Sequence, residues 1–587
     1  MVVYDRSIFR APETIKVGQN EAILLANGDE RNSANRVCWP EQQNLEKQLG
    51  EAFGREGWKL TRAHSHDPIK GHGFIESQSQ GDAVFDRIPT DAPVVVAEAV
   101  WQYSNQLAYR LWEHEGPILI ASNFDGTWPG LVGAAGLEAC LTKHKYKPGQ
   151  KGHSFLWSSQ EFKDPDSQQR LRQFLTEGGI TYDTSHARPL GEVDTKQYAD
   201  AVEFGRYLGM HMRKQRARLG VFDPLCMGML NAAFDEEVLV DTGISVRRLN
   251  QSDLYAEMQE VPPERGLRYA QQLERWGMRV DRPKDPNTKF SKTKVTDGQL
   301  AEQGQAYEGM VRIAYREGLD GVGLPYQLGL ARLCAASDLM PEGTMNSTRR
   351  PAVRYKGMTL FKGEPVMCAN EADMGCGVDQ IMSKRILQGM HLPPETTQHD
   401  LRWGDQYKGK HRDRPDIDVD AFAWVFELSG NTPAEHVEGG WGGVTAVRQP
   451  YMYFKKGGAA MKAICKPGET VWSRVYIDQG ELCMDIGRGG VLALPPEETE
   501  RRWKATTEQW PIMHALTYGV TRDQMMAKHK SNHITVRYAP DAGSANEVMF
   551  ALAGMASEMG MKVNICGSYR AEDSIQYRLA HGMPIVG

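Results

Sequence analysis

Short, continuous apolar runs recur along the first three quarters of the chain, and each is followed by a turn or a helical pattern. They include residues 92–100, 117–122, 321–324, 365–369 and 421–428. Runs this short are typical of strands that are buried on both faces, as in parallel sheets covered by helices. The pattern therefore predicts an α/β architecture for this part of the chain.

The pattern changes after Gly430. Apolar and polar residues alternate at 470–478, 481–486 and 491–494, and glycines lie between these segments. Alternation of this kind predicts antiparallel strands joined by tight turns. We therefore expect a β-rich C-terminal region.

Three further segments shape the expected domain organisation. A helix-rich stretch near 196–215 separates two α/β regions, and a polar stretch at 279–297 indicates a loop or insertion. A stretch rich in proline and acidic residues at 391–420 is predicted to be irregular. The expected fold is two Rossmann-like parallel-sheet domains followed by a β-rich domain, at residues 1–190, 191–432 and 433–587.

The composition is that of a globular protein. The chain has 587 residues, of which 41% are hydrophobic and 25% charged, and this excludes disordered, collagen-like and coiled-coil proteins. Its formal charge of −6 gives no electrostatic indication of a nucleic-acid or membrane-surface partner. The nine cysteines are scattered without a Cys-x-x-Cys pair, which favours reduced thiols. With no signal peptide or membrane span apparent, we expect a cytoplasmic protein.

Nucleotide-binding fingerprints are incomplete. The segment 404–410 resembles a P-loop, but His411 replaces the serine or threonine that would bind magnesium. Gly-x-Gly pairs occur, but in three of them Glu76, Tyr326 and Gln380 replace the last glycine of the dinucleotide fingerprint. The sequence therefore gives no support for a nucleotide cofactor.

Acidic residues lie where predicted buried strands end. Glu371 and Asp373 directly follow the run at 365–369, and Glu427 lies inside an apolar strand pattern. A buried carboxylate without a partner costs several kcal/mol, so each needs a cation or a hydrogen-bond donor nearby. An ion pair with lysine or arginine would serve for either residue alone. When both strand patterns are considered together, a functional site is the better interpretation. An extended chain would also place Glu371 and Asp373 on the same side.

Two more features add candidate ligands. His533 opens an apolar strand, and an imidazole combined with two carboxylates suits Mn²⁺, Mg²⁺, Co²⁺ or Fe²⁺. Asp416, Asp418 and Asp420 alternate and would share one face of an extended segment. A solvated strand edge is the more economical interpretation of these three aspartates, with a metal role as the alternative.

At this point the sequence resembles the L-fucose isomerase (D-arabinose isomerase) family. The resemblance is patchy, but it runs over most of the chain in the right order. Its patches lie at 27–31, 101–103, 123–130, 219–228, 320–327, 369–373, 426–427, 451, 510–511 and 532–533.

The resemblance implies a metal-dependent aldose–ketose isomerase. In that family a divalent metal, typically Mn²⁺, is held by a Glu, an Asp and a His and binds two oxygens of the open-chain sugar. Glu371 and His533 match the family Glu and His, and Glu427 is the nearest counterpart of the Asp, with Asp418 or Asp420 as fallbacks. Glu371 and Glu427 would then act as base and acid in an enediol mechanism, with a hydride shift as the alternative.

Further positions follow from the same resemblance. Trp101 matches an aromatic residue that reaches a neighbouring subunit's site, although core packing would explain it equally well. The implied assembly is a homo-oligomer, commonly a hexamer, and the implied substrate is a small sugar such as L-fucose or D-arabinose. The alternatives are a sugar or sugar-acid lyase or aldolase on the same fold, and a non-catalytic sugar-binding protein. The expected substrate-binding residues are Arg31, Trp101, Gln327, Tyr451, Trp510 and Asn532.

Overall fold

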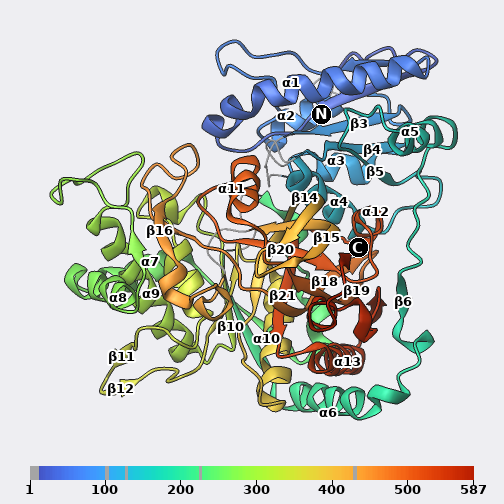
Figure 1. The fold of residues 1–587 in the computed structure, drawn as a ribbon. Helices are drawn as coiled ribbons and strands as arrows, with labels where there is room; N and C mark the ends of the chain where they lie inside the picture. The colour runs from blue at the N-terminus through green and yellow to red at the C-terminus, as the bar shows by residue number, and fades with distance from the viewer. Residues whose placement is uncertain (1–11, 100–104, 126–129, 224–227, 428–431) are drawn as a thin grey trace, which may run out of the picture. The chain divides into compact units, whose positions relative to one another are not determined.

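The computed structural model describes residues 12–99, 105–125, 130–223, 228–427 and 432–587 (Figure 1). The chain forms two compact units, Met1–Thr181 and Tyr182–Gly587, and each is described by itself. In the described residues no helix combines the length and apolar character needed to cross a bilayer. The expected division into three domains stays a prediction.

Unit 1 contains a parallel sheet of five strands in the order β2-β1-β3-β4-β5. The apolar runs at 92–100 and 117–122 form β3 and β4, and both strands are largely buried. Helices on the sheet bury its apolar face, since residues of α1 and α5 share a core with β1, β3 and β4. The bounds are β1 Glu21–Ala26, β2 Lys59–Arg62, β3 Val94–Glu98, β4 Ile118–Asn123, β5 His153–Ser158, α1 Asn32–Arg55, α2 Gln78–Phe85, α3 Ala108–Glu113, α4 Gly130–Thr142 and α5 Pro165–Glu177.

Unit 2 begins with a second parallel sheet, in the order β13-β10-β7-β8. Its strands include the predicted runs at 321–324 and 365–369. The polar stretch at 279–297 is mostly a loop that ends at the capping box of α9. The bounds are β7 Ala217–Phe222, β8 Ile244–Leu249, β9 Arg279–Val280, β10 Gly321–Leu324, β13 Met367–Asn370, α6 Ala199–Gln215, α7 Gln251–Gln259, α8 Pro263–Arg275, α9 Asp297–Glu317 and α10 Met374–Gly389.

The C-terminal part of unit 2 is rich in β-structure and contains a closed barrel. The pairings run β18-β21-β14-β15-β20-β19 and return from β19 to β18, and β22 and β6 extend the sheet beyond β19. The predicted alternating segments 470–478 and 481–486 form the β18–β19 hairpin. The prediction of a strand at 491–494 is wrong, because β19 ends at Val491 and no strand follows it there. The bounds are β6 Ala187–Pro189, β14 Thr397–His411, β15 Arg414–Glu427, β18 Gly468–Asp478, β19 Glu481–Val491, β20 Ile512–Thr517, β21 His533–Ala539, β22 Lys562–Cys566, α11 Pro496–Ala505, α12 Arg522–Lys528, α13 Ala542–Glu558 and α14 Ile575–Ala580.

Small elements complete unit 2. β16 pairs with both β17 and β9, β11 pairs with β12, and β23 pairs with β15. The bounds are β11 Arg354–Tyr355, β12 Met358–Thr359, β16 Thr445–Arg448, β17 Ala459–Lys462 and β23 Ile585–Val586.

The structure corrects the prediction for 391–420. This stretch is largely a long antiparallel hairpin of β14 and β15, not an irregular segment. Its outer half alternates exposed charged residues with buried apolar ones such as Ile417 and Val419, and the acidic content hid this alternation. Residues 421–427 of the next apolar run also belong to the antiparallel strand β15 and not to a parallel sheet. A strand in a closed barrel can be buried on both faces, as a parallel strand is, so the apolar run alone did not distinguish the two.

Helices α6 and α13 join the beginning of unit 2 to its C-terminal part. They pack closely because glycines lie at the contact: a Cβ added to Gly205 would lie 1.8 Å from the carbonyl oxygen of Ala551. A Cβ added to Gly554 would lie 2.2 Å from the carbonyl oxygen of Val202. Residues of α6, α10, α13 and the barrel strands β18 and β19 share one hydrophobic core. This packing holds α10, and the acidic segment before it, against the barrel.

Candidate metal centre

The carboxyl end of the parallel sheet in unit 2 supplies the first candidate ligands. Glu371 directly follows β13. Gln327 lies shortly after β10, the strand that is paired with β13. Glu371 and Ala372 both adopt left-handed backbone conformations, with φ of 59° and 53°. The chain is therefore not extended here, contrary to the expectation for Glu371 and Asp373. Such conformations cost roughly 1–3 kcal/mol each and cluster at functional sites.

Asp373 is the N-cap of α10 and orients His533. Its Oδ1 accepts a hydrogen bond of 2.9 Å from the Cys376 N–H, and its Oδ2 accepts one of 2.7 Å from Nδ1 of His533. The guanidinium of Arg474 lies 2.9 Å from the same Oδ2. Burial raises the pKa of Asp373, but Arg474 and His533 outweigh burial and hold this pKa well below its usual range. An ionised Asp373 fixes the imidazole ring and turns Nε2 toward the opposite side.

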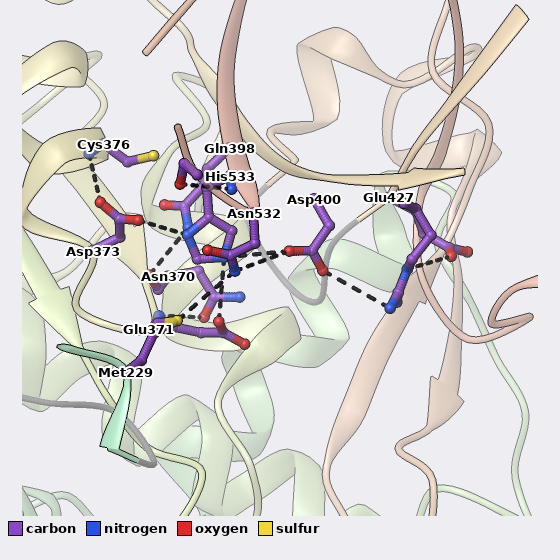
Figure 2. Close-up of polar contacts among 12 residues, drawn as sticks. Met229, Asn370, Glu371, Asp373, Cys376, Gln398, Asp400, Glu427, Asn532 and His533 are labelled. Atoms are coloured by element: carbon purple, nitrogen blue, oxygen red, sulfur yellow. Dashed lines mark hydrogen bonds and ion pairs between the residues drawn. The ribbon is translucent and has the colours of Figure 1, made fainter. Parts of the chain in front are cut away.

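Nε2 of His533 faces two further carboxylates. Glu371 Oε2 lies 3.3 Å from it and Asp400 Oδ1 lies 3.4 Å from it (Figure 2). Glu371 Oε2 and His533 Nε2 have no hydrogen-bond partner within the described part of the chain. Ligand atoms at about 2.1 Å from one ion in octahedral geometry lie about 3 Å from each other. Glu371, Asp400 and His533 therefore form the arrangement best suited to hold a divalent ion.

A second grouping, Asp373, Cys376 and His533, also brings three ligand atoms within 4.8 Å of one another. However, Nη1 of Arg474 donates both to Asp373 Oδ2, at 2.9 Å, and to Cys376 Sγ, at 3.0 Å. A fixed positive charge thus occupies this side. Burial, together with the charge of Asp373, raises the pKa of the Cys376 thiol and disfavours the thiolate that a metal would need. This grouping is a poorer ion site than the one on Nε2.

The register of the barrel explains why Asp400 lies between His533 and Glu427. Asp400 of β14 is paired with His533 of β21 on one side and with Glu427 of β15 on the other. Directly paired residues point to the same face, and neighbouring strands are about 4.8 Å apart, so Glu427 is about 10 Å across the sheet from His533. Figure 2 shows the same order, with Asp400 between the other two side chains.

Glu427 is paired with Arg402 instead. Its Oε2 lies 3.3 Å from Nε of Arg402, and Nη1 of Arg402 lies 3.9 Å from Asp400 Oδ2. Arg402 is at an irregularity in the β14–β15 register, where bulges commonly re-aim side chains. Burial raises the pKa of Glu427 to about 8, although the charge of Arg402 lowers it. Glu427 therefore contacts Arg402, which in turn contacts the candidate ligand Asp400.

The sequence reasoning missed two acidic residues beside Glu371. Asp338 and Glu342 are completely buried in the turn after 334–337. Tyr326 donates a hydrogen bond to Asp338, and Ser337 donates one of 3.2 Å to Glu342. Burial, with the charge of Glu371 adding to it, raises the pKa of Asp338 to about 8, and burial and Asp338 raise that of Glu342. No periodic or strand-end signal in the sequence marks these two positions.

The cluster carries an excess of acidic groups. Two guanidinium groups and one imidazole, those of Arg402, Arg474 and His533, accompany the acids in the buried interior. The acidic side chains are Asp338, Glu342, Glu371, Asp373, Asp400 and Glu427. Buried charges need partners, so this imbalance favours a bound cation or retained protons.

Three of the predicted substrate-binding residues contact the cluster. Gln327 Nε2 donates to Glu371 Oε1 at 2.8 Å, and Asn532 Nδ2 lies 3.5 Å from Asp400 Oδ1. The Trp510 indole donates to Gln449 at 3.0 Å, and its ring lies 5.0 Å from the guanidinium of Arg402. These amides and this indole are groups that can bind sugar hydroxyls and C–H faces.

The other predicted residues lie elsewhere. Tyr451 is 37% exposed, and its ring faces Phe290, Lys292 and Arg448. Arg31 is in unit 1, in an ion pair of 2.7 Å with Asp29, and Trp101 lies outside the described residues. The fallback ligands Asp418 and Asp420 are on the exposed end of β15, paired with Lys410 and Lys408.

The chain matches no protein-family model and no curated protein sequence. The activity of the cluster must therefore be inferred from its own geometry and chemistry.

Proposed function

We propose that the protein is a divalent-metal-dependent aldose–ketose isomerase with its metal centre at Glu371, Asp400 and His533. The observation that carries this proposal is the convergence of two carboxylate oxygens on Nε2 of His533, at 3.3 and 3.4 Å, while Asp373 holds Nδ1. A carboxylate behind a histidine is the usual arrangement around metal-binding imidazoles. Hard oxygen donors with one imidazole suit Mn²⁺ or a similar ion.

The residues around this centre supply what the isomerisation requires. A bound divalent ion would polarise two adjacent sugar oxygens and acidify the C–H bond on the carbon next to the carbonyl group. A carboxylate must then accept the proton from one carbon and return it to the next. Burial and repulsion from neighbouring carboxylates raise the pKa of Asp338 to about 8 and also raise the pKa of Glu342, which favours their protonated forms. Glu371 would be the base that accepts the proton from carbon, and Glu342, which lies outside the three proposed ligands and whose raised pKa favours the protonated form, is suited to supply a proton.

The neighbouring polar side chains would hold the sugar. Gln327 and Asn532 present amides to the candidate ligands, and Trp510 presents an indole beside Arg402. Glu427, with a pKa of about 8, carries a proton at neutral pH and can donate it. This assignment keeps Glu371 and Glu427 within the proton-transfer machinery and adds Glu342 to it.

The resemblance to the L-fucose isomerase family supports the finer parts of the proposal. It favours Mn²⁺ as the ion, L-fucose or D-arabinose as the sugar, and a cytoplasmic homohexamer built from subunits with two Rossmann-like domains. In such an assembly Trp101 would belong to the sugar site of a neighbouring subunit, and Arg31 would be a further substrate-binding residue.

The proposal is tested by incubating the Mn²⁺-loaded protein with L-fucose or D-arabinose and following the products by NMR. We expect the ketose to form, and Glu342→Gln to abolish its formation while binding of Mn²⁺ is retained. The exposed variant Asp418→Asn is the matched control and should keep full activity. Cleavage products in place of a ketose would favour a lyase or aldolase, and sugar binding without any turnover would favour a non-catalytic protein.

A further inference from the structure

A polar cavity lies in unit 2 away from the candidate metal centre, and none of the six clustered acids lines it. Its volume is about 440 Å³, within the usual range for small-molecule sites. It is formed by the end of β18, the starts of β19 and β22, the end of α13 and the last residue of α12. The lining residues are Tyr476, Asp478, Cys483, Lys528, Lys562 and Asn564, with Ser557, Val563 and the turn at 189–191.

A buried carboxylate lies directly behind the cavity wall. Asp485 is 2% exposed, and its Oδ1 accepts hydrogen bonds from Asn564, at 2.7 Å, and Tyr476, at 3.3 Å. Its Oδ2 accepts no hydrogen bond from the described residues, and the nearest cation, Nζ of Lys528, is 3.7 Å away. Burial raises the pKa of Asp485. Asp485 therefore holds Asn564 and Tyr476, two residues that line the cavity, in place.

Lys528 supplies positive charge to the same cavity. Its Nζ donates to the Tyr476 hydroxyl at 2.9 Å, and that hydroxyl in turn donates to Asp485. An ammonium has three donors, and only one is used in this hydrogen bond, while the side chain is 21% exposed. Lys562, at the rim, adds a second ammonium, which is paired with the exposed Glu481. Lys528 can therefore donate to a ligand without losing its contact with Tyr476.

Asp478 completes the recognition pattern. It lines the cavity half-buried at the end of β18, and both Lys528 and Lys562 interact with its charge. The cavity thus offers an ammonium at one point and carboxylate and amide acceptors near it. A phosphate dianion would be repelled by Asp478 and Asp485, whereas a neutral polyol would leave the two remaining donors of Lys528 without an anion.

We propose that this cavity binds a small hydroxy acid, with the ligand carboxylate on Lys528 and its hydroxyls on Asp478 and Asn564. The site is independent of the metal centre and of the isomerase activity proposed above. A carboxylate on an ammonium is a charge-assisted hydrogen bond, and the hydroxyls match the acceptors that remain.

The test uses the full-length protein and D-gluconate as the probe, with sorbitol as the matched polyol that lacks the carboxylate. Calorimetry should show gluconate binding in the micromolar to millimolar range, and sorbitol should bind at least about tenfold more weakly. Lys528→Met should weaken gluconate binding by about tenfold or more, whereas Lys504→Met, on an exposed helix surface, should leave it unchanged. Equal affinities for sorbitol and gluconate, or an unaffected Lys528→Met variant, would overturn the proposal.

Two further measurements locate the ligand. The thiol of Cys483 lines the cavity, so gluconate should slow its alkylation by iodoacetamide severalfold. Inorganic phosphate should give no comparable protection, and tighter binding of phosphate than of gluconate would reject the hydroxy-acid assignment. Lys528→Met removes a buried contact, so its thermal unfolding is compared with that of Lys528→Arg. The Lys528→Arg variant should also retain part of the gluconate affinity.

Discussion

His533 is held from one side and exposed to carboxylates on the other, and this asymmetry defines the candidate site. Asp373 accepts the Nδ1 proton at 2.7 Å and is itself bound by Arg474. The ring therefore has one orientation, and Nε2 faces Glu371 and Asp400. The sequence could indicate Glu371 and His533, because Glu371 directly follows an apolar strand and His533 begins one. It could not indicate Asp400, because the stretch around it was interpreted as irregular.

The role of Asp373 predicts that Asp373→Asn weakens Mn²⁺ binding by about 10–100-fold, because an amide no longer fixes the imidazole tautomer. Titration calorimetry with Mn²⁺ measures this directly. Asp418→Asn, on the exposed end of β15, is the control and should bind like the wild type. Unchanged affinity in Asp373→Asn would mean that Nε2 is not a ligand.

The choice between Asp400 and Glu427 as the third ligand is also testable. Asp400→Asn should reduce bound Mn²⁺ strongly, and Glu427→Gln should reduce it little, because Glu427 is separated from His533 by Asp400. Elemental analysis after gel filtration gives the metal content of each variant. The reverse order of effects would restore Glu427 as a ligand.

Glu427 should also make stability depend on pH. Its pKa rises from an ordinary value of 4.5 to about 8 on folding, so between these pH values the folded state retains a proton that the unfolded state loses. Its contribution to stability is therefore fully present below pH 4.5 and is lost as the pH rises toward 8. In the wild type this group should lower the free energy of unfolding by about 2 kcal/mol between pH 5 and 8. Glu427→Gln should lack this decrease, and urea unfolding of the metal-free proteins measures it. Parallel stability–pH curves for the two proteins would contradict the assignment.

Among the secondary-structure elements, the sequence predicts several short buried strands but not which strands pair with each other in the sheets. The runs at 321–324 and 365–369 form β10 and β13, and the alternating segments at 470–486 form the β18–β19 hairpin. Strand pairing depends on contacts between segments far apart in the sequence, and these have no local signal. The closure of β18 onto both β19 and β21 is such a case, as is the placement of β14 between β15 and β21.

The close contact of α6 and α13 gives a prediction at this scale. Gly205→Ala would place a Cβ 1.8 Å from the backbone oxygen of Ala551, so the helices must separate. We expect a loss of about 2 kcal/mol or more in the free energy of unfolding, since overpacking typically costs 1–3 kcal/mol. Gly50→Ala, on helix α1 with open space around it, should be neutral or stabilising by up to about 1 kcal/mol. Chemical denaturation compares the two, and equal stabilities would show that the helices tolerate the added methyl group.

At the scale of the whole molecule, the two compact units differ in what they offer a metal ion. The candidate ligands Glu371, Asp400 and His533 all belong to unit 2. Glu371 follows β13 of the parallel sheet, whereas Asp400 and His533 lie on the barrel strands β14 and β21. An ion that binds all three would connect the carboxyl end of the parallel sheet to the barrel. Because the unfolded chain cannot assemble this set, bound metal should stabilise unit 2 in particular.

This expectation is measurable by calorimetric unfolding with excess EDTA or with Mn²⁺ at about 100 times its dissociation constant. Mass action then adds about 2.7 kcal/mol to the stability of the unit that binds the ion. The unfolding of unit 2 should therefore shift to higher temperature, while a fragment or transition belonging to unit 1 should not shift. In Glu371→Gln the shift should shrink or vanish, because one of the three ligands loses its charge. A Mn²⁺-induced shift of equal size in Glu371→Gln and the wild type would place the ion elsewhere, and with it the chemistry that the clustered carboxyl groups are proposed to perform.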